Sequence, residues 1–121
     1  MTRITVIEDN PDNRLLLHAL LEDSYIITEY ENGLIALEGM KQDRPDLILL
    51  DISLPELDGI RVLQRIREQS DLKNVPVIAL TAHAMVGDRE RFLESGFDGY
   101  VMKPIVDENI LFEEIHRLLA E

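Results

Sequence analysis

The chain has 121 residues, close to the commonest size of a single domain, and 45% of them are hydrophobic, which is enough to build one core. It contains no cysteine, so disulfides, thiol nucleophiles and thiolate metal sites are excluded. Its 24 acidic residues outnumber its 12 basic residues, and the net charge of -12 disfavours direct binding to nucleic acid and favours basic partners and cations.

The first third of the chain predicts two strand–helix pairs. Residues 3–8 are rich in β-branched side chains and predict a strand, and Asn10 followed by Pro11 is a typical helix start. Four leucines give the helix that follows an apolar face. Residues 24–30 predict a second strand that ends at residues 32–33, and leucines at helical spacing predict a second helix after it.

Three further strand–helix pairs are expected in the rest of the chain. Residues 47–50 form an apolar run that is typical of a strand buried on both faces of a parallel sheet. Residues 77–80 and 99–102 predict two more strands, with a helix at 85–95 between them that Gly96 would end. Apolar residues at helical spacing predict a helix before residue 77 and another at the end of the chain. They are Ile60, Leu63, Ile66, Leu111, Ile115 and Leu118.

This strict alternation of strands and helices predicts a single α/β domain over residues 1–121, with right-handed crossovers. The length suits a flavodoxin-like (βα)5 fold better than a six-stranded dinucleotide fold. Such a fold is a doubly wound parallel sheet with strand order 2-1-3-4-5 and helices on both faces. Ligands bind where the strand order reverses, between strands one and three, which is where Glu8, Asp9 and Asp51 are expected.

Side chains able to do chemistry are found at the carboxyl ends of four predicted strands. Glu8 and Asp9 come at the end of the first strand, Asp51 follows the third, Thr81 the fourth and Lys103 the fifth. Three carboxylates in one small space repel one another unless a cation relieves them, and Mg²⁺ prefers oxygen ligands. A carboxylate nucleophile, a metal, a hydroxyl and an ammonium are the groups needed to accept a phosphoryl group. Singly, each residue is also explained by helix capping, a strand end or solvation, and the joint placement favours a site.

The whole chain resembles the response-regulator receiver domain of two-component and phosphorelay signalling. The last predicted helix leaves no residues for an output domain, so we expect either a stand-alone receiver or a receiver excised from a longer protein, and Met1 directly before the first strand favours the stand-alone form. The segment 84–90 also resembles the single-domain, DivK-type regulators. The matching positions are 8–10, 51, 54–55, 58–59, 81–82, 96–100 and 103–104.

The resemblance implies a phosphoacceptor and a metal site. Asp51 would accept a phosphoryl group from a phosphohistidine on a sensor histidine kinase or a histidine phosphotransfer protein. Mg²⁺, or Mn²⁺, would be bound by Asp9, Asp51 and the backbone carbonyl of Ser53, and Glu8 would act through a metal-bound water. The Glu at position 8 replaces a more frequent Asp and keeps the reach for this contact.

The resemblance also implies a switch. Thr81 would hydrogen-bond the phosphoryl group and Lys103 would pair with it. Movement of Thr81 would let Tyr100 turn inward, and the surface of helix four, strand five and helix five would change its affinity for a downstream protein. Ser53 and His83 would flank the phosphoryl group and tune its lifetime. Taken alone, Tyr100 also fits a half-buried strand aromatic and His83 a surface residue.

The remaining expectations concern partners and rival functions. We expect a cytoplasmic protein, monomeric or weakly dimeric, without membrane insertion, since no apolar run approaches the roughly 18 residues needed to span a bilayer. It would phosphorylate and dephosphorylate itself but turn over no free substrate, so it is not expected to be an ordinary enzyme. One alternative is a pseudo-receiver that signals without phosphorylation, against which the full acidic set argues. The other is an enzyme on this fold, but Glu8 and Asp9 would repel a flavin phosphate, and Ser53 stands where an aspartyl-phosphate phosphatase needs a second Asp.

Overall fold

The computed structural model describes residues 2–54, 57–82, 87–103, 105 and 107–119. One parallel sheet has the strand order β2-β1-β3-β4-β5, which confirms the predicted flavodoxin-like topology. The strands are β1 (Arg3–Ile7), β2 (Ile26–Tyr30), β3 (Leu47–Asp51), β4 (Val77–Thr81) and β5 (Gly99–Met102). The helices are α1 (Pro11–Leu21), α2 (Gly33–Gly39), α3 (Gly59–Glu68), α4 (Asp88–Ser95) and α5 (Glu108–Leu119).

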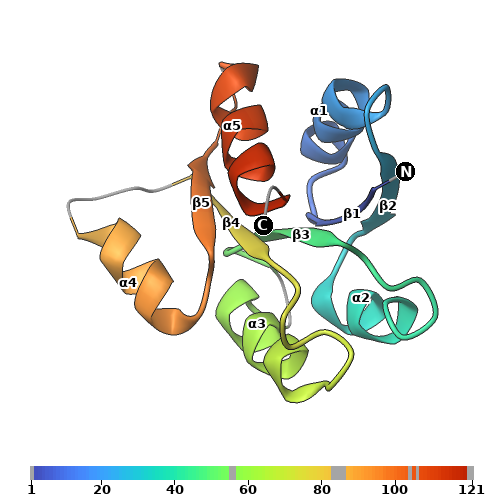
Figure 1. Cartoon of the computed structure of the whole chain (residues 1–121), viewed down its shortest axis with the longest axis vertical. Coiled ribbons are helices and arrows are strands. Elements are labelled where there is room, and N and C mark those ends of the chain that lie inside the picture. The colour runs from blue at the N-terminus through green and yellow to red at the C-terminus, as the bar shows by residue number, and fades with distance from the viewer. Residues whose placement is uncertain (1, 55–56, 83–86, 104, 106, 120–121) are drawn as a thin grey trace.

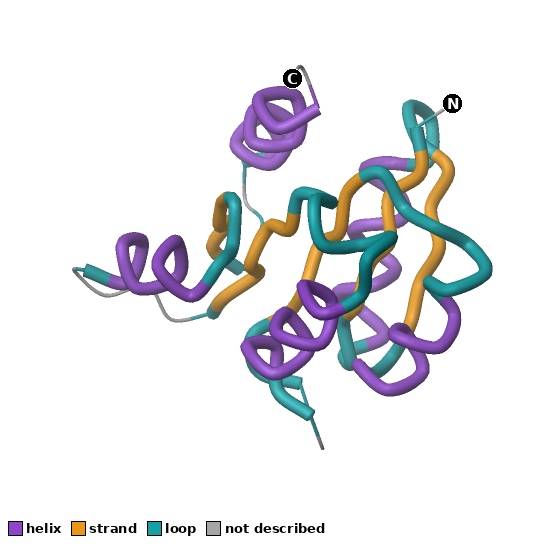
Figure 2. The backbone as a smooth tube through the Cα atoms, turned by 60° about the horizontal axis from the view of Figure 1, so that its bottom comes forward, coloured by secondary structure: helices purple, strands orange, loops and turns teal. Residues whose placement is uncertain are grey.

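Helices cover both faces of this sheet. Figure 1 shows α1 and α5 together on one side and α2 and α3 on the other, and Figure 2 shows the strands side by side as one layer. One apolar cluster joins α1 and α5 to the sheet, around Leu17, Leu21 and Leu111. The other joins α2, α3 and α4 to the opposite face, and Leu63 and Phe92 belong to it. All residues of β3 and β4 are buried between the two clusters, as expected for central parallel strands.

Local signals explain where two of the helices begin or end. The Asn10 side chain accepts hydrogen bonds from the backbone N–H groups of Asp12 and Asn13, and Pro11 occupies the first helical position of α1. Gly96, with a φ of 110°, takes the left-handed conformation that ends α4. Both features were predicted from the sequence.

Some boundaries differ from the prediction. The second strand begins at Ile26 rather than at residue 24, because the N–H groups of Ser24 and Tyr25 both bond to the Leu21 carbonyl in a turn after α1. Asp51 lies within β3 instead of after it, and among the described residues α4 begins at Asp88. The residues 83–86, which include the predicted start of that helix and His83, lie outside the described part of the chain.

The predicted apolar faces of α1 and α2 are only partly buried. Leu17 and Leu21 are covered as expected, whereas Leu16 is 39% exposed and Leu34 is 50% exposed. Neither residue is turned fully onto the sheet, so the stripe that meets the core is narrower than the leucine pattern suggested. None of the helices in the described residues is long and apolar enough to cross a membrane.

Candidate functional site

The carboxyl end of the sheet brings together charged residues that are far apart in the sequence. Glu8 follows β1, Asp51 ends β3 and Lys103 follows β5. The Nζ atom of Lys103 donates to Oε1 of Glu8 at 2.8 Å and to Oδ2 of Asp51 at 3.2 Å. The side chains of Glu8 and Asp51 are 0% and 3% exposed, and that of Lys103 is 15% exposed. A buried ammonium therefore bridges two buried carboxylates.

Asp9 completes an acidic cluster on the open side of this pair. One carboxylate oxygen from each of Glu8, Asp9 and Asp51 can be chosen so that all three lie within 4.8 Å of one another. Asp9 is exposed, while the other two side chains are buried. Three oxygen donors, without nitrogen or sulfur, form the kind of ligand set that a hard divalent cation such as Mg²⁺ prefers. The residues therefore fit the predicted metal.

The close packing of like charges changes how these groups titrate. Burial raises the pKa of Glu8 to about 7, and the contact with Asp51 adds to the rise. Burial also acts to raise the pKa of Asp51, but its contacts with Glu8, the Ser53 N–H and Lys103 outweigh burial, and the pKa lies below its usual value. Burial acts to lower the pKa of Lys103, and its two carboxylate partners raise it overall. Of Glu8 and Asp51, Asp51 is thus the carboxylate that stays anionic at neutral pH.

Thr81 and Ser53 lie next to this cluster. Thr81 ends β4 between β3 and β5, since its carbonyl accepts from the Lys103 N–H at 2.7 Å while the neighbouring Leu80 is paired with Asp51. The Thr81 residue is 5% exposed. The backbone N–H of Ser53 donates to Oδ1 of Asp51 at 2.9 Å and so orients that carboxylate. The structure therefore brings Thr81 and Ser53 to the acidic cluster, and their roles toward a phosphoryl group or a metal stay predictions.

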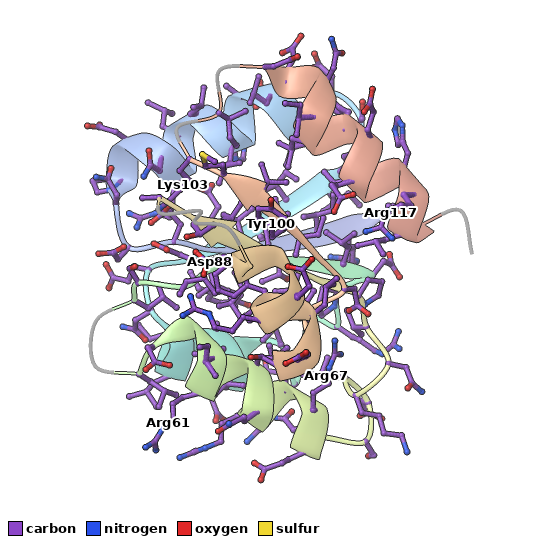
Figure 3. All side chains as sticks on the ribbon, turned by 90° about the vertical axis from the view of Figure 1, so that its left-hand side faces the viewer. Arg61, Arg67, Asp88, Tyr100, Lys103 and Arg117 are labelled. Carbon is purple, nitrogen blue, oxygen red and sulfur yellow. The ribbon has the colours of Figure 1, made fainter. Side chains whose placement is uncertain are left out.

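The side chain of Tyr100, on β5, packs against α4. Its side chain is half-buried, and its ring centroid lies 6.1 Å from that of Phe92 with the two rings inclined by 50°. Figure 3 shows Tyr100 and Lys103 on the same part of the molecule, with the helix α4 below Tyr100 in this view. A groove of about 310 Å³ runs beside Tyr100, lined also by Met102, Ile110 and Glu113.

One residue of the site was not predicted. Arg14 of α1 donates from Nη1 to the carbonyl oxygen of Glu8 at 2.7 Å and to that of Asp9 at 3.1 Å. The signal that could have found it is its place one turn after the Asn10 cap, because helical side chains lean back toward the helix start. A basic residue there can reach the loop that precedes the helix.

Comparisons with known proteins agree with this geometry. Residues 4–116 match the response regulator receiver domain family. The polar-differentiation response regulator DivK of Brucella anthropi is 44% identical over 103 residues, which cover 84% of each protein. The signal transduction histidine-protein kinase BarA of Shigella flexneri is 43% identical over 108 residues, which cover 88% of this chain and 12% of BarA.

Solved structures of receiver domains have the same fold. The receiver domain of the sensor histidine kinase PA1611 from Pseudomonas aeruginosa PAO1, with a magnesium ion coordinated in its active site cleft, superposes with a TM-score of 0.89. It is 36% identical, and the match covers 99% of this chain and 98% of that one. The family match, the relatives and the acidic cluster lead to one conclusion: the chain belongs to the response regulator receiver domain family of two-component signalling.

Proposed function

We propose that this receiver accepts a phosphoryl group on Asp51 from a phosphohistidine of a sensor histidine kinase or a histidine phosphotransfer protein. The observation that carries the proposal is the meeting of Glu8, Asp9, Asp51 and Lys103 at the carboxyl end of the sheet. Asp51 is the candidate nucleophile because it is buried, carries a lowered pKa and lies beside a cation. Membership in the receiver family supports the same role.

The transfer exchanges one bond at phosphorus for another. A carboxylate oxygen of Asp51 forms a bond to phosphorus as the bond between phosphorus and the imidazole nitrogen of the donor breaks. The electron pair of the broken bond stays on that nitrogen, which takes up a proton, so that the products are an aspartyl phosphate and a histidine. Since the pKa of Asp51 is low, the nucleophile is already ionised, and the N–H of Ser53 keeps its carboxylate oriented.

Mg²⁺, or Mn²⁺, is the cofactor that this ligand set would hold. Asp9 and Asp51 would bind it directly together with the backbone carbonyl of Ser53, and Glu8 would contact it through water. When bound there, the cation would supply positive charge to offset that of the phosphoryl oxygens. The magnesium ion in the active site cleft of the PA1611 receiver domain supports this assignment.

Lys103 and Thr81 are proposed to bind the new phosphoryl group. Lys103 would exchange its bond to Glu8 for one to a phosphoryl oxygen, because the added charge lies on Asp51. The Thr81 hydroxyl would donate to another oxygen, and Tyr100 would respond by changing its packing against Phe92. Ser53 and His83 would control the access of water and thus the lifetime of the modification. The domain would then have two conformations, and the contacts of Lys103 and Thr81 with the phosphoryl group would shift the equilibrium toward the conformation in which they form.

The output of such a switch is a change in protein binding. The surface of α4, β5 and α5 would bind a downstream protein with an affinity that depends on phosphorylation, and hydrolysis of the aspartyl phosphate would reset it. The chain would then act as a signalling component and turn over no free substrate. Its acidic surface argues for a protein target rather than nucleic acid.

The test is the intact mass of the protein after incubation with acetyl phosphate, with Mg²⁺ or with EDTA. We expect one added phosphoryl group in the wild type, dependent on Mg²⁺ and absent from Asp51→Asn. Rapid acid quenching at several times guards against loss by hydrolysis. A wild type that gains no mass at any time would overturn the proposal and favour a receiver that signals without phosphorylation. An Asp51→Asn variant that gains it equally would overturn the assignment of Asp51 and place the phosphoryl group on another residue.

A further inference from the structure

Arg14 holds the backbone of the acidic loop, defined here as residues 8–10 between β1 and α1. Its Nη1 atom donates to the carbonyl oxygens of two consecutive residues, Glu8 at 2.7 Å and Asp9 at 3.1 Å. Two peptide planes of the loop are therefore fixed by one guanidinium. Arg14 is itself half-buried, so its bond to the Glu8 carbonyl is less open to solvent than a surface ion pair.

The rest of the acidic loop is held as well. The Glu8 N–H donates to the Tyr30 carbonyl at 3.1 Å, and the Asn10 N–H donates to Oε2 of Glu8 at 3.2 Å. The carbonyl of Asn10 accepts from the Arg14 N–H at 3.0 Å. Within the part of the chain that the structure describes, the carboxylate of Asp9 has no hydrogen-bond or ion-pair partner. The loop backbone is thus fixed while its exposed carboxylate stays available, as in a preorganised ligand site.

We propose that Arg14 is a positioning residue for the divalent cation. It would order the acidic loop so that Glu8 and Asp9 meet Asp51 at a spacing that one cation can bridge. The inference rests on the proposed function, because the cation is the one that phosphoryl transfer would use. Arg14 acts only through the loop carbonyls; without it the two peptide planes turn more freely, and the entropy of ordering them opposes cation binding.

The charge of Arg14 has the opposite effect. A guanidinium close to a cation site repels the cation, so its removal would by itself tighten Mg²⁺ binding. Loss of a positioning contact weakens binding, and partners that orient metal ligands typically contribute about 10-fold or more to metal affinity. The direction in which the Kd for Mg²⁺ changes when Arg14 is replaced therefore distinguishes a positioning role from simple charge repulsion.

The experiment is Mg²⁺ titration by calorimetry of the wild type, Arg14→Met and Arg14→Lys. It is done well below the unfolding temperature, with circular dichroism to confirm the fold. Arg61→Met is the matched control, since Arg61 is exposed on α3 and well separated from Lys103 (Figure 3). The unfolding temperature of each protein in EDTA and in Mg²⁺ gives a second readout that does not depend on phosphorylation.

We expect the Kd for Mg²⁺ to rise roughly 10-fold in Arg14→Met and by less in Arg14→Lys, which keeps one donor group but loses the planar fork. Arg61→Met should bind Mg²⁺ as the wild type does or slightly more tightly. Equal or tighter binding by Arg14→Met would overturn the positioning role. If Arg14→Met fails to fold, Arg14→Lys decides, and a Kd equal to that of the wild type overturns it. A wild type that binds no Mg²⁺ would instead contradict the proposed function.

Discussion

Lys103 donates a hydrogen bond of 2.8 Å to Glu8, which lies 95 positions earlier in the chain. Lys103 follows β5 and Glu8 follows β1, and these two strands lie on opposite sides of the central strand β3. The Lys103 side chain therefore reaches across the end of β3 to Glu8. Both side chains are shielded from solvent. This ammonium supplies a positive charge that offsets the two buried carboxylates, Glu8 and Asp51.

Replacing Lys103 by Met should destabilise the metal-free protein at pH 8. Removal of one partner from a buried ion pair leaves an uncompensated charge, which costs about 3 kcal/mol of unfolding free energy. Mg²⁺ should recover most of this loss, because a cation at the acidic cluster replaces the missing charge. Urea unfolding in EDTA measures the loss of unfolding free energy, and urea unfolding in Mg²⁺ measures its recovery. The control is Lys41→Met, because Lys41 forms an exposed ion pair with Glu38. A loss that is the same with and without Mg²⁺ would show that Lys103 and the cation do not share a role.

The affinity for Mg²⁺ should depend on pH through Glu8. Its pKa is raised to about 7, so below pH 7 a proton occupies the carboxylate that the cation needs, and affinity must rise with pH. For one such group we expect Kd to fall about 10-fold between pH 6 and pH 8. Calorimetry at several pH values measures this, and Glu8→Gln, which cannot ionise, should flatten the dependence. An equally steep dependence in Glu8→Gln would assign the titration to another group.

A second charged contact should stabilise the end of the sheet opposite Lys103, where Figure 3 shows Arg67. Arg67 donates to the Val75 carbonyl at 2.7 Å, the Gly96 carbonyl at 3.0 Å and Oδ2 of Asp98 at 2.8 Å. It therefore ties α3 to the loops before β4 and β5. We expect Arg67→Ala to lower the unfolding free energy by about 2 kcal/mol, since these partly buried acceptors lose their donor. Arg65→Ala, on the exposed face of the same helix, should change it little, and equal effects of the two in urea unfolding would contradict this role.

Thr81→Ala should separate phosphorylation from the response to it. The variant keeps Asp51 and the acidic cluster, so it should still gain a phosphoryl group from acetyl phosphate. It lacks the hydroxyl that would draw β4 toward that group, so amide chemical shifts in β5 and α5 should change less than in the wild type. Thr81→Ser retains the hydroxyl and should behave like the wild type. Shift changes in Thr81→Ala as large as those of the wild type would exclude Thr81 from the switch.

The fold and the residues of the candidate site that follow predicted strands could be predicted, because both depend on the alternation of strands and helices. Alternating strands and helices fix a parallel sheet, and the carboxyl ends of parallel strands meet at one edge. Asp51 and Lys103 could therefore be placed together from their positions after strands. The start of α1 and the end of α4 could also be predicted, because Asn10 is a favourable N-cap residue and Gly96 can adopt the left-handed conformation that ends a helix.

Contacts that depend on side-chain reach could not be predicted. The sequence does not say that Arg14 turns back to the acidic loop, or that Arg67 meets Asp98 across 31 positions, because both depend on how the helices are rotated against the sheet. The same rotation leaves Leu16 and Leu34 partly exposed although their spacing suits a buried face. The start of β2 was misplaced because Tyr25 has a high strand propensity but completes a turn.

Phosphorylation at Asp51 is tested most directly by reductive trapping. Borohydride reduces an aspartyl phosphate to homoserine with release of phosphate, so the modified position is read from peptide masses. After acetyl phosphate and Mg²⁺, we predict homoserine at position 51 and at no other aspartate, and none when EDTA replaces Mg²⁺. Homoserine at Asp9 or any other aspartate, with Asp51 unchanged in protein that carries the phosphoryl group, would contradict the assignment.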